Sequence, residues 1–270
     1  MTTLTEASAS TDAALYGHEV LLSGSDWSHT VHWYDPTHLA TPAFWIEQAR
    51  QRPRPETYQV GSTLLEEVAL CLLGGHGITE QMAYVSFARL RGEGLLTGAR
   101  QSVPRLHAAL ARPFDVPGCP RPVRYRFPML KAERLSAAID VLASSTPPSP
   151  NQPRVLRDWL LRVPGVGAKT ASWVLRNLTR SDDIAVIDIH IRRAGVVAGV
   201  FDPTWKLPRD YRRFEEAFVQ WARLGGVPTA DLDACIWASL AELGRRARVI
   251  LGVKSLSDRS SPREWCSAAG

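Results

Sequence analysis

The sequence has 270 residues, enough to bury a substantial core and to form two domains. Hydrophobic residues make up 45% and charged residues 22%, so composition excludes a disordered chain but neither an enzyme nor a binding module. Lysine and arginine outnumber the acidic residues by 32 to 27, which gives a net charge of +5 and a pI near 9.2. This mild excess suits a polyanionic partner.

The cysteines and the N-terminus bear on cofactors and location. Four cysteines lie far apart with no Cys-x-x-Cys pair: Cys71, Cys119, Cys235 and Cys266. We therefore expect buried or incidental thiols, with no zinc site, no iron–sulfur cluster and no other cofactor. No basic-then-apolar leader opens the chain, and no apolar run approaches the roughly 18 residues of a membrane span. We expect no membrane association and a reducing, cytoplasmic location.

The first 60 residues predict little regular structure. Residues 1–15 predict a flexible tail, because the first dozen are rich in Thr, Ser and Ala, and order is expected to begin near Tyr16. Residues 18–23 hold almost the only alternating strand pattern. Thr41, Pro42 and Ala43 predict the cap and first turn of a short helix through Arg50. A Pro-rich stretch at 52–55 ends it.

Helical periodicity dominates the rest of the chain. Apolar residues mark one face over 64–73 and again over 82–90. Further helices are expected over 103–111, 129–144, 153–162, 168–179, 188–198, 209–224 and 230–250. The Ser- and Pro-rich residues 144–153 predict a solvated linker. The sequence therefore predicts an all-α protein of about ten helices.

The most informative stretch is 160–175, LLRVPGVGAKTASWVL. An apolar-periodic helix meets Pro164 and two glycines, Gly165 and Gly167, and a helix resumes at Ala168. Glycines permit positive φ and close approach of another backbone. The pattern predicts a helix-hairpin-helix whose unpaired N–H groups at the start of the second helix attract a phosphate. An ordinary helical hairpin packed in a core is the structural alternative.

Lys169 and Asp188 are the candidate catalytic residues. Lys169 lies in the first turn of the second helix, where the helix dipole disfavours a charged amine, so it is either a nucleophile or a surface lysine that contacts phosphate. Asp188 follows an apolar run nineteen residues downstream, where an aspartate is most often a helix N-cap. The pairing with Lys169 favours a chemical role.

These residues resemble a known family. VPGVGAKTAS at 163–172, followed by VIDIH at 186–190, is similar to the signature of the helix-hairpin-helix base-excision DNA glycosylases, the superfamily of endonuclease III and the 8-oxoguanine glycosylases. Weaker similarity covers about 61–200. Residues 70–76 (LCLLGGH) resemble the helix and loop that fill the gap left by a flipped nucleotide, and 125–135 resemble the segment before the interdomain linker.

The resemblance implies a bifunctional glycosylase/AP lyase. Lys169 would displace the base from C1′ of a flipped nucleotide, a Schiff base would form, and β-elimination would nick the strand, with Asp188 stabilising charge on the sugar and shuttling protons. The lone cysteines differ from the four closely spaced cluster ligands of endonuclease III, and 171–177 look more like the compact 8-oxoguanine enzymes. Excision of an oxidised purine, with 8-oxoguanine foremost, is therefore preferred. Excision of oxidised pyrimidines or another modified base, and a non-catalytic DNA-binding protein, remain alternatives.

The expected partner is double-stranded DNA with a damaged base, bound by a monomer. In the hairpin, Gly165, Val166, Gly167 and Ala168 would hold the backbone. His76 could wedge into the duplex gap or be a plain loop histidine, and Trp237 is the candidate to stack on the extruded base. Six arginines would contact phosphates without reading sequence: Arg154, Arg157, Arg162, Arg176, Arg192 and Arg193.

The resemblance also implies a domain arrangement. Residues 61–185 would form one helical domain that ends in the hairpin. Residues 16–60 would join 186–270 in the other, with DNA across the cleft between them.

Overall fold

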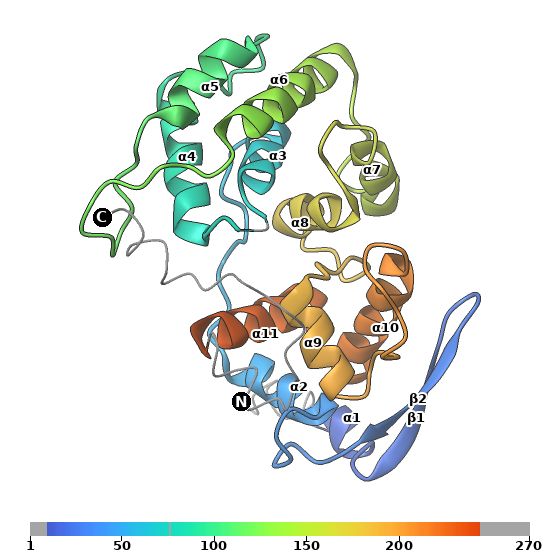
Figure 1. Ribbon diagram of the computed structural model, residues 1–270. Helices are drawn as coiled ribbons and strands as arrows, with labels where there is room; N and C mark the ends of the chain where they lie inside the picture. The colour runs from blue at the N-terminus through green and yellow to red at the C-terminus, as the bar shows by residue number, and fades with distance from the viewer. Residues whose placement is uncertain (1–9, 76, 244–270) are drawn as a thin grey trace, which may run out of the picture. The chain divides into compact units, whose positions relative to one another are not determined.

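The computed structural model describes residues 10–75 and 77–243 (Figure 1). The described chain divides into two compact units: residues 10–56 with 180–243 form unit 1, and residues 57–179 form unit 2. Sequence analysis placed the divisions a few residues later, after 60 and after 185. The fold is all-α, as predicted, with one small two-stranded sheet.

Unit 1 contains both strands and five helices among the described residues. In chain order they are α1 (Ser10–Ala13), β1 (His18–Ser23), β2 (Ser28–Trp33), α2 (Pro42–Gln51), α9 (Ile189–Val197), α10 (Tyr211–Leu224) and α11 (Thr229–Leu243). Helices α2 and α9 pack on α11, and α10 packs on both α11 and β1. Aromatic rings fill the core around α10, where Phe214 meets Phe201 and Trp205 edge-on and Phe218 meets Trp221.

Unit 2 consists of helices α3 to α8. They are α3 (Leu64–Leu73), α4 (Glu80–Gly92), α5 (Val103–Ala111), α6 (Pro128–Ser144), α7 (Pro153–Leu160) and α8 (Ala168–Thr179). Helix α3 contacts α4, α6 and α8, while α5 packs on α6 and α7 on α8. The apolar faces expected over 64–73 and 82–90 are buried, including Val68, Leu73, Phe87 and Leu90. The central position of α3 places its C-terminal end beside the helix that carries Lys169.

The predicted helices all form: those over 64–73, 103–111 and 168–179 have the predicted ends, and the others differ at one end or both. Helix α4 extends to Glu80 and Gly92, beyond the 82–90 marked by apolar residues, because Thr79 caps it through an acceptor bond from the Met82 N–H. Helix α7 ends at Leu160 rather than 162, where the chain turns into the hairpin. The expected end of the last helix near 250 lies outside the described residues.

Two features of the N-terminal region differ from expectation. Order begins before Tyr16, because Asp12 is fully buried and accepts hydrogen bonds from Trp33 Nε1 at 2.6 Å and Arg50 Nη1 at 3.1 Å. A second strand, β2, pairs antiparallel with β1 from His18↔Trp33 to Ser23↔Ser28. Its alternation puts Val31 and Trp33 into the core, with His32 exposed between them.

Candidate active site

The predicted helix-hairpin-helix is present in unit 2 as α7, a turn at 161–167, and α8 (Figure 1). Apolar side chains anchor it: Leu160, Val163 and Val166 are at most 7% exposed. The Val166 N–H donates to Val163 O at 3.0 Å and closes the turn. Buried valines thus hold the turn inward, while Pro164 and Gly165 between them are exposed.

The two glycines of the turn have different conformations. Gly165 has φ +84°, the left-handed region that favours glycine, and an added Cβ would lie 2.8 Å from Cδ of Arg134. Gly167 does not have a positive φ, and an added Cβ there would meet nothing within 4 Å. Of the two glycines that permit a positive φ in the turn, only Gly165 adopts one. In the free protein, that position has room for a side chain.

The first backbone N–H groups of α8 have no acceptor within the helix. The first intrahelical bond runs from the Ala171 N–H to Gly167 O at 2.9 Å, so the N–H groups of Ala168, Lys169 and Thr170 precede it. Gly167 is exposed and has no side chain that could cap them. This geometry matches the anion-attracting helix start that the sequence predicts.

Helix α8 is held firmly against α3. Glu67 of α3 is fully buried, and its Oε2 accepts from Asn177 Nδ2 of α8 at 2.9 Å. Its other oxygen accepts from the Val60 and Gly61 N–H groups at 2.6 and 2.5 Å. Sequence analysis missed this carboxylate, although an acid within the apolar face of 64–73 is a signal of a buried hydrogen-bonded group.

Lys169 occupies the first turn of α8 and is half-buried. Its Nζ lies 5.8 Å from the ring centroid of Trp173, one turn later, within the range of a cation–π contact. Among the described residues, none forms a hydrogen bond or ion pair with this amine. A lysine held by a ring rather than by a carboxylate keeps its amine available to another molecule.

Asp188 lies in unit 1 at the N-cap of α9, so the capping role is real. Its Oδ1 accepts from the His190 and Ile191 N–H groups at 2.8 and 2.9 Å. The side chain therefore has one oxygen fixed by the helix and one, Oδ2, without a hydrogen-bond partner among the described residues.

Buried polar side chains fix the segment that leads to Asp188. Tyr211 Oη donates to Ala185 O at 3.0 Å and accepts from the Ile187 N–H at 3.1 Å. Glu215 accepts from the Ala185 N–H at 3.3 Å. Sequence analysis missed both, although Glu215 stands four residues after Tyr211 on the buried face of α10, where an acid is unusual.

The remaining predicted residues are spread over both units. Arg162 is exposed in the hairpin turn of unit 2, whereas Arg193 on α9 and Trp237 on α11 are half-buried in unit 1. His76 and Cys266 lie outside the described residues. Cys71 and Cys235 are buried, and desolvation raises the pKa of both thiols.

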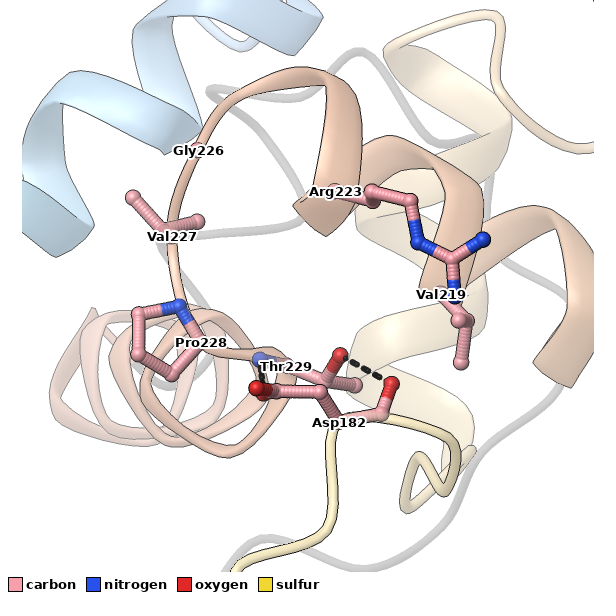
Figure 2. Close-up of a pocket in the computed structure, with 7 residues that line it drawn as sticks. All are labelled: Asp182, Val219, Arg223, Gly226, Val227, Pro228 and Thr229. Carbon is pink, nitrogen blue, oxygen red and sulfur yellow. Dashed lines mark hydrogen bonds between the residues drawn. The ribbon is translucent and has the colours of Figure 1, made fainter. Parts of the chain in front are cut away.

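One hollow of about 310 Å³ lies in unit 1 at the start of α11 (Figure 2). Asp182 spans its floor, accepting the Thr229 N–H at 2.9 Å through Oδ1 and the Thr229 hydroxyl at 2.8 Å through its carbonyl. None of the predicted site residues lines it. Arg223, which also lines the hollow, lies 3.7 Å from the carboxylate of Asp183 outside it, so the side-chain hydrogen bonds between lining residues are those of Asp182 with Thr229 at the start of α11.

Over 10–75 and 77–243, no three His, Cys, Asp or Glu side chains gather as metal ligands do. No helix in this part of the chain is long and apolar enough to cross a membrane.

Comparison with known families decides the lineage. The family model described as 8-oxoguanine DNA glycosylase matches residues 56–226, more than half of the chain, and this match includes both Lys169 and Asp188. The chain belongs to this family. The resemblance inferred from the motifs is thereby confirmed.

Individual relatives of this family member are distant. An 8-oxoguanine DNA glycosylase/AP lyase of Fusobacterium nucleatum is 31% identical over 84 residues, which are 30% of this chain and 39% of that protein. A non-covalent complex of endonuclease III with DNA is 17% identical, with a TM-score of 0.54 over 83% of this chain and 92% of the other. The Methanocaldococcus jannaschii 8-oxoguanine glycosylase/lyase, in complex with a 15mer DNA containing 8-oxoguanine, is 20% identical over 74% and 89% with a TM-score of 0.49. The endonuclease III likeness shows a shared fold.

Proposed function

We propose that this protein is a bifunctional DNA glycosylase/AP lyase that excises an oxidised purine, 8-oxoguanine foremost, from double-stranded DNA. The observation that carries the proposal is the amine of Lys169. It stands at the exposed start of α8 with no hydrogen-bond or ion-pair partner among the described residues, inside the segment that matches the 8-oxoguanine glycosylase family. An unpaired lysine next to a phosphate-attracting helix start suits nucleophilic attack on a nucleotide.

The reaction begins at C1′ of the damaged nucleotide. The neutral amine of Lys169 forms a bond to C1′ as the bond to the base breaks, and the departing base takes a proton. Opening of the sugar ring gives a protonated Schiff base, which acidifies the C2′ proton. Loss of that proton expels the 3′ phosphate by β-elimination, which nicks the strand. The target nucleotide must leave the base stack for the amine to reach it.

Asp188 supplies the accompanying charge and proton transfer. The free Oδ2 would stabilise positive charge on the sugar as the base leaves and would then accept a proton. The two bonds to Oδ1 hold the carboxylate in one orientation, and Tyr211 and Glu215 fix the chain that precedes it. Unit 1 would therefore contribute to the reaction by orienting the carboxylate of Asp188.

DNA is held through its backbone. The N–H groups after Gly167 would bind one phosphate, with Gly165, Val166 and Ala168 shaping the turn and exposed Arg162 adding charge. Arg193 would bind backbone from unit 1. Trp237 would stack on the extruded base, and His76 would fill the gap that the base leaves in the duplex. The protein would act as a monomer.

The test is excision from a panel of duplexes that carry 8-oxoguanine, an oxidised pyrimidine or an abasic site. We expect base release and nicking without added alkali, fastest on the 8-oxoguanine duplex. A faster reaction on the oxidised pyrimidine would correct the substrate. Binding without release or nicking on any duplex would leave only a DNA-binding protein.

A further inference from the structure

Three consecutive carbonyls at the C-terminal end of α3 accept hydrogen bonds from one segment of the chain. Lys131 Nζ donates to Leu72 O and, at 2.8 Å, to Gly74 O, while Tyr125 Oη donates to Leu73 O. The last carbonyls of a helix have no partner within it. Lys131 and Tyr125 therefore complete the end of α3 and fix the position of Gly74.

Lys131 is an unusual choice for this task. It is 8% exposed, and burial, reinforced by Arg134 and then Lys169, lowers its pKa to about 8. Among the described residues, the groups that shift this pKa besides burial are two cations, and no carboxylate offsets the desolvation of the ammonium. The hydrogen bonds to the two carbonyls offset the cost of burying the ammonium, and one of them binds it to Gly74.

Gly74 in turn sets the place of the ring under Lys169. A Cβ at Gly74 would lie 3.0 and 3.1 Å from Cη2 and Cζ3 of Trp173, so the backbone here touches the indole. The amine of Lys169 lies over the same ring, so the indole of Trp173 is contacted by both Gly74 and Lys169. A contiguous path thus runs from Lys131 through Gly74 and Trp173 to Lys169, within unit 2.

We propose that Lys131 is a positioning residue for the nucleophile, holding Gly74 so that Trp173 presents the amine of Lys169 toward DNA. This inference rests on the proposed function, in which Lys169 attacks C1′. It assigns Lys131 no contact with the substrate. Removing its hold should slow attack without weakening the grip on DNA.

The sharpest variant is Gly74→Ala. Gly74 has φ −78°, which alanine adopts freely, so the added methyl acts only by pressing on Trp173. A misplaced reacting group costs up to about a hundredfold in rate. We expect the single-turnover rate of borohydride trapping at saturating protein to fall roughly tenfold or more. Affinity for undamaged duplex should stay unchanged.

Gly92→Ala is the matched control, because Gly92 ends α4 in the same unit and a Cβ there meets nothing within 4 Å. It should trap at the wild-type rate. Lys131→Met, which keeps an unbranched apolar side chain one atom shorter and removes the donors, should reproduce the loss if circular dichroism shows it folded. If Lys131→Met does not fold, Gly74→Ala still tests the path from Gly74 through Trp173 to Lys169, on which the role of Lys131 depends.

The outcomes separate the two proposals. Wild-type protein that traps no DNA overturns the proposed function. Wild-type protein that traps, together with Gly74→Ala that traps equally fast, overturns the positioning role of Lys131. A rate loss in Gly74→Ala with an equal loss of duplex affinity also overturns it, since that would be damage to the DNA-binding surface.

Discussion

At the scale of single residues, Gly165 and Gly167 of the hairpin face different demands. Gly165 is required by the fold, because any side chain there combines a positive φ with a collision against Arg134. Gly167 is not required by the fold, because its φ is not positive and its surroundings are open. A demand for glycine at 167 would therefore come from the bound DNA.

This difference predicts the behaviour of Gly167→Val. The variant should fold as the wild type does, yet bind lesion-bearing and undamaged duplex more weakly by similar factors, because a bulky side chain blocks the approach of a phosphate that carries no base identity. Fluorescence anisotropy after a circular dichroism check measures both affinities. Gly165→Ala is the contrasting variant, and its main effect should be lower thermal stability. Undiminished binding by folded Gly167→Val would show that the hairpin only packs the unit.

Asp188 offers a second single-residue test. Asparagine caps helices as well as aspartate does, so Asp188→Asn should keep the bonds to the His190 and Ile191 N–H groups and preserve α9. It loses the negative charge, and we expect excision to slow on the order of a hundredfold or more. Single-turnover excision and a melting curve measure the two effects. A wild-type rate with normal binding would reduce Asp188 to a helix cap.

At the scale of elements, the end of α3 makes stability depend on pH. The folded pKa of Lys131 is about 8, below its usual 10.5, so between these values the unfolded chain binds more protons than the folded one. Stability from this group is present above the unfolded value and is lost as pH falls through about 8. Tyr125 opposes it only above pH ~10, where an unfolded tyrosine ionises while burial keeps the folded one protonated.

We therefore expect the free energy of unfolding to gain about 2 kcal/mol from Lys131 between pH 8 and 10. Urea unfolding across this range, compared between wild type and Lys131→Met, isolates the contribution. The wild-type curve should rise relative to that of the variant. Parallel curves would mean that Lys131 keeps an ordinary pKa in the folded protein.

Sequence periodicity predicts most elements here, and the failures have physical reasons. The amphipathic stripe over 103–111 predicts its helix because burial on one face repeats every turn. The apolar residues of 64–73 also predict a helix, although in the fold that helix is buried on all sides from Glu67 to Leu73. Strand β2 was not predicted because only two of its residues, Val31 and Trp33, are buried. Helix α1 was not predicted because its buried residue Asp12 is an aspartate, and the hydrogen-bond donors Trp33 and Arg50 lie far along the chain.

The candidate site divides in the same way. Lys169, Asp188 and the hairpin belong to local motifs, so the motifs and their resemblance to a known family point to them. Their supports, Lys131 and Tyr125 in unit 2 and Tyr211 and Glu215 in unit 1, act through contacts between distant segments. A buried charge within an apolar stripe is the only sequence sign of such a support, and it gives no partner.

At the scale of the whole molecule, the account requires that residues from two units serve one reaction. Lys169 and the hairpin belong to unit 2, and Asp188 belongs to unit 1. The family match spans both, from residue 56 to 226. The proposed chemistry therefore draws on residues of both units, and its test uses the full 270-residue chain.

The central claim is that the amine of Lys169 bonds covalently to DNA during base excision. Borohydride added during reaction with an 8-oxoguanine duplex reduces a Schiff base to a stable link. The account predicts a protein–DNA adduct for the wild type, mapped by peptide mass spectrometry to Lys169, and none for Lys169→Gln that still binds the duplex. An adduct of equal yield with Lys169→Gln, or excision by the wild type with no adduct, would contradict it.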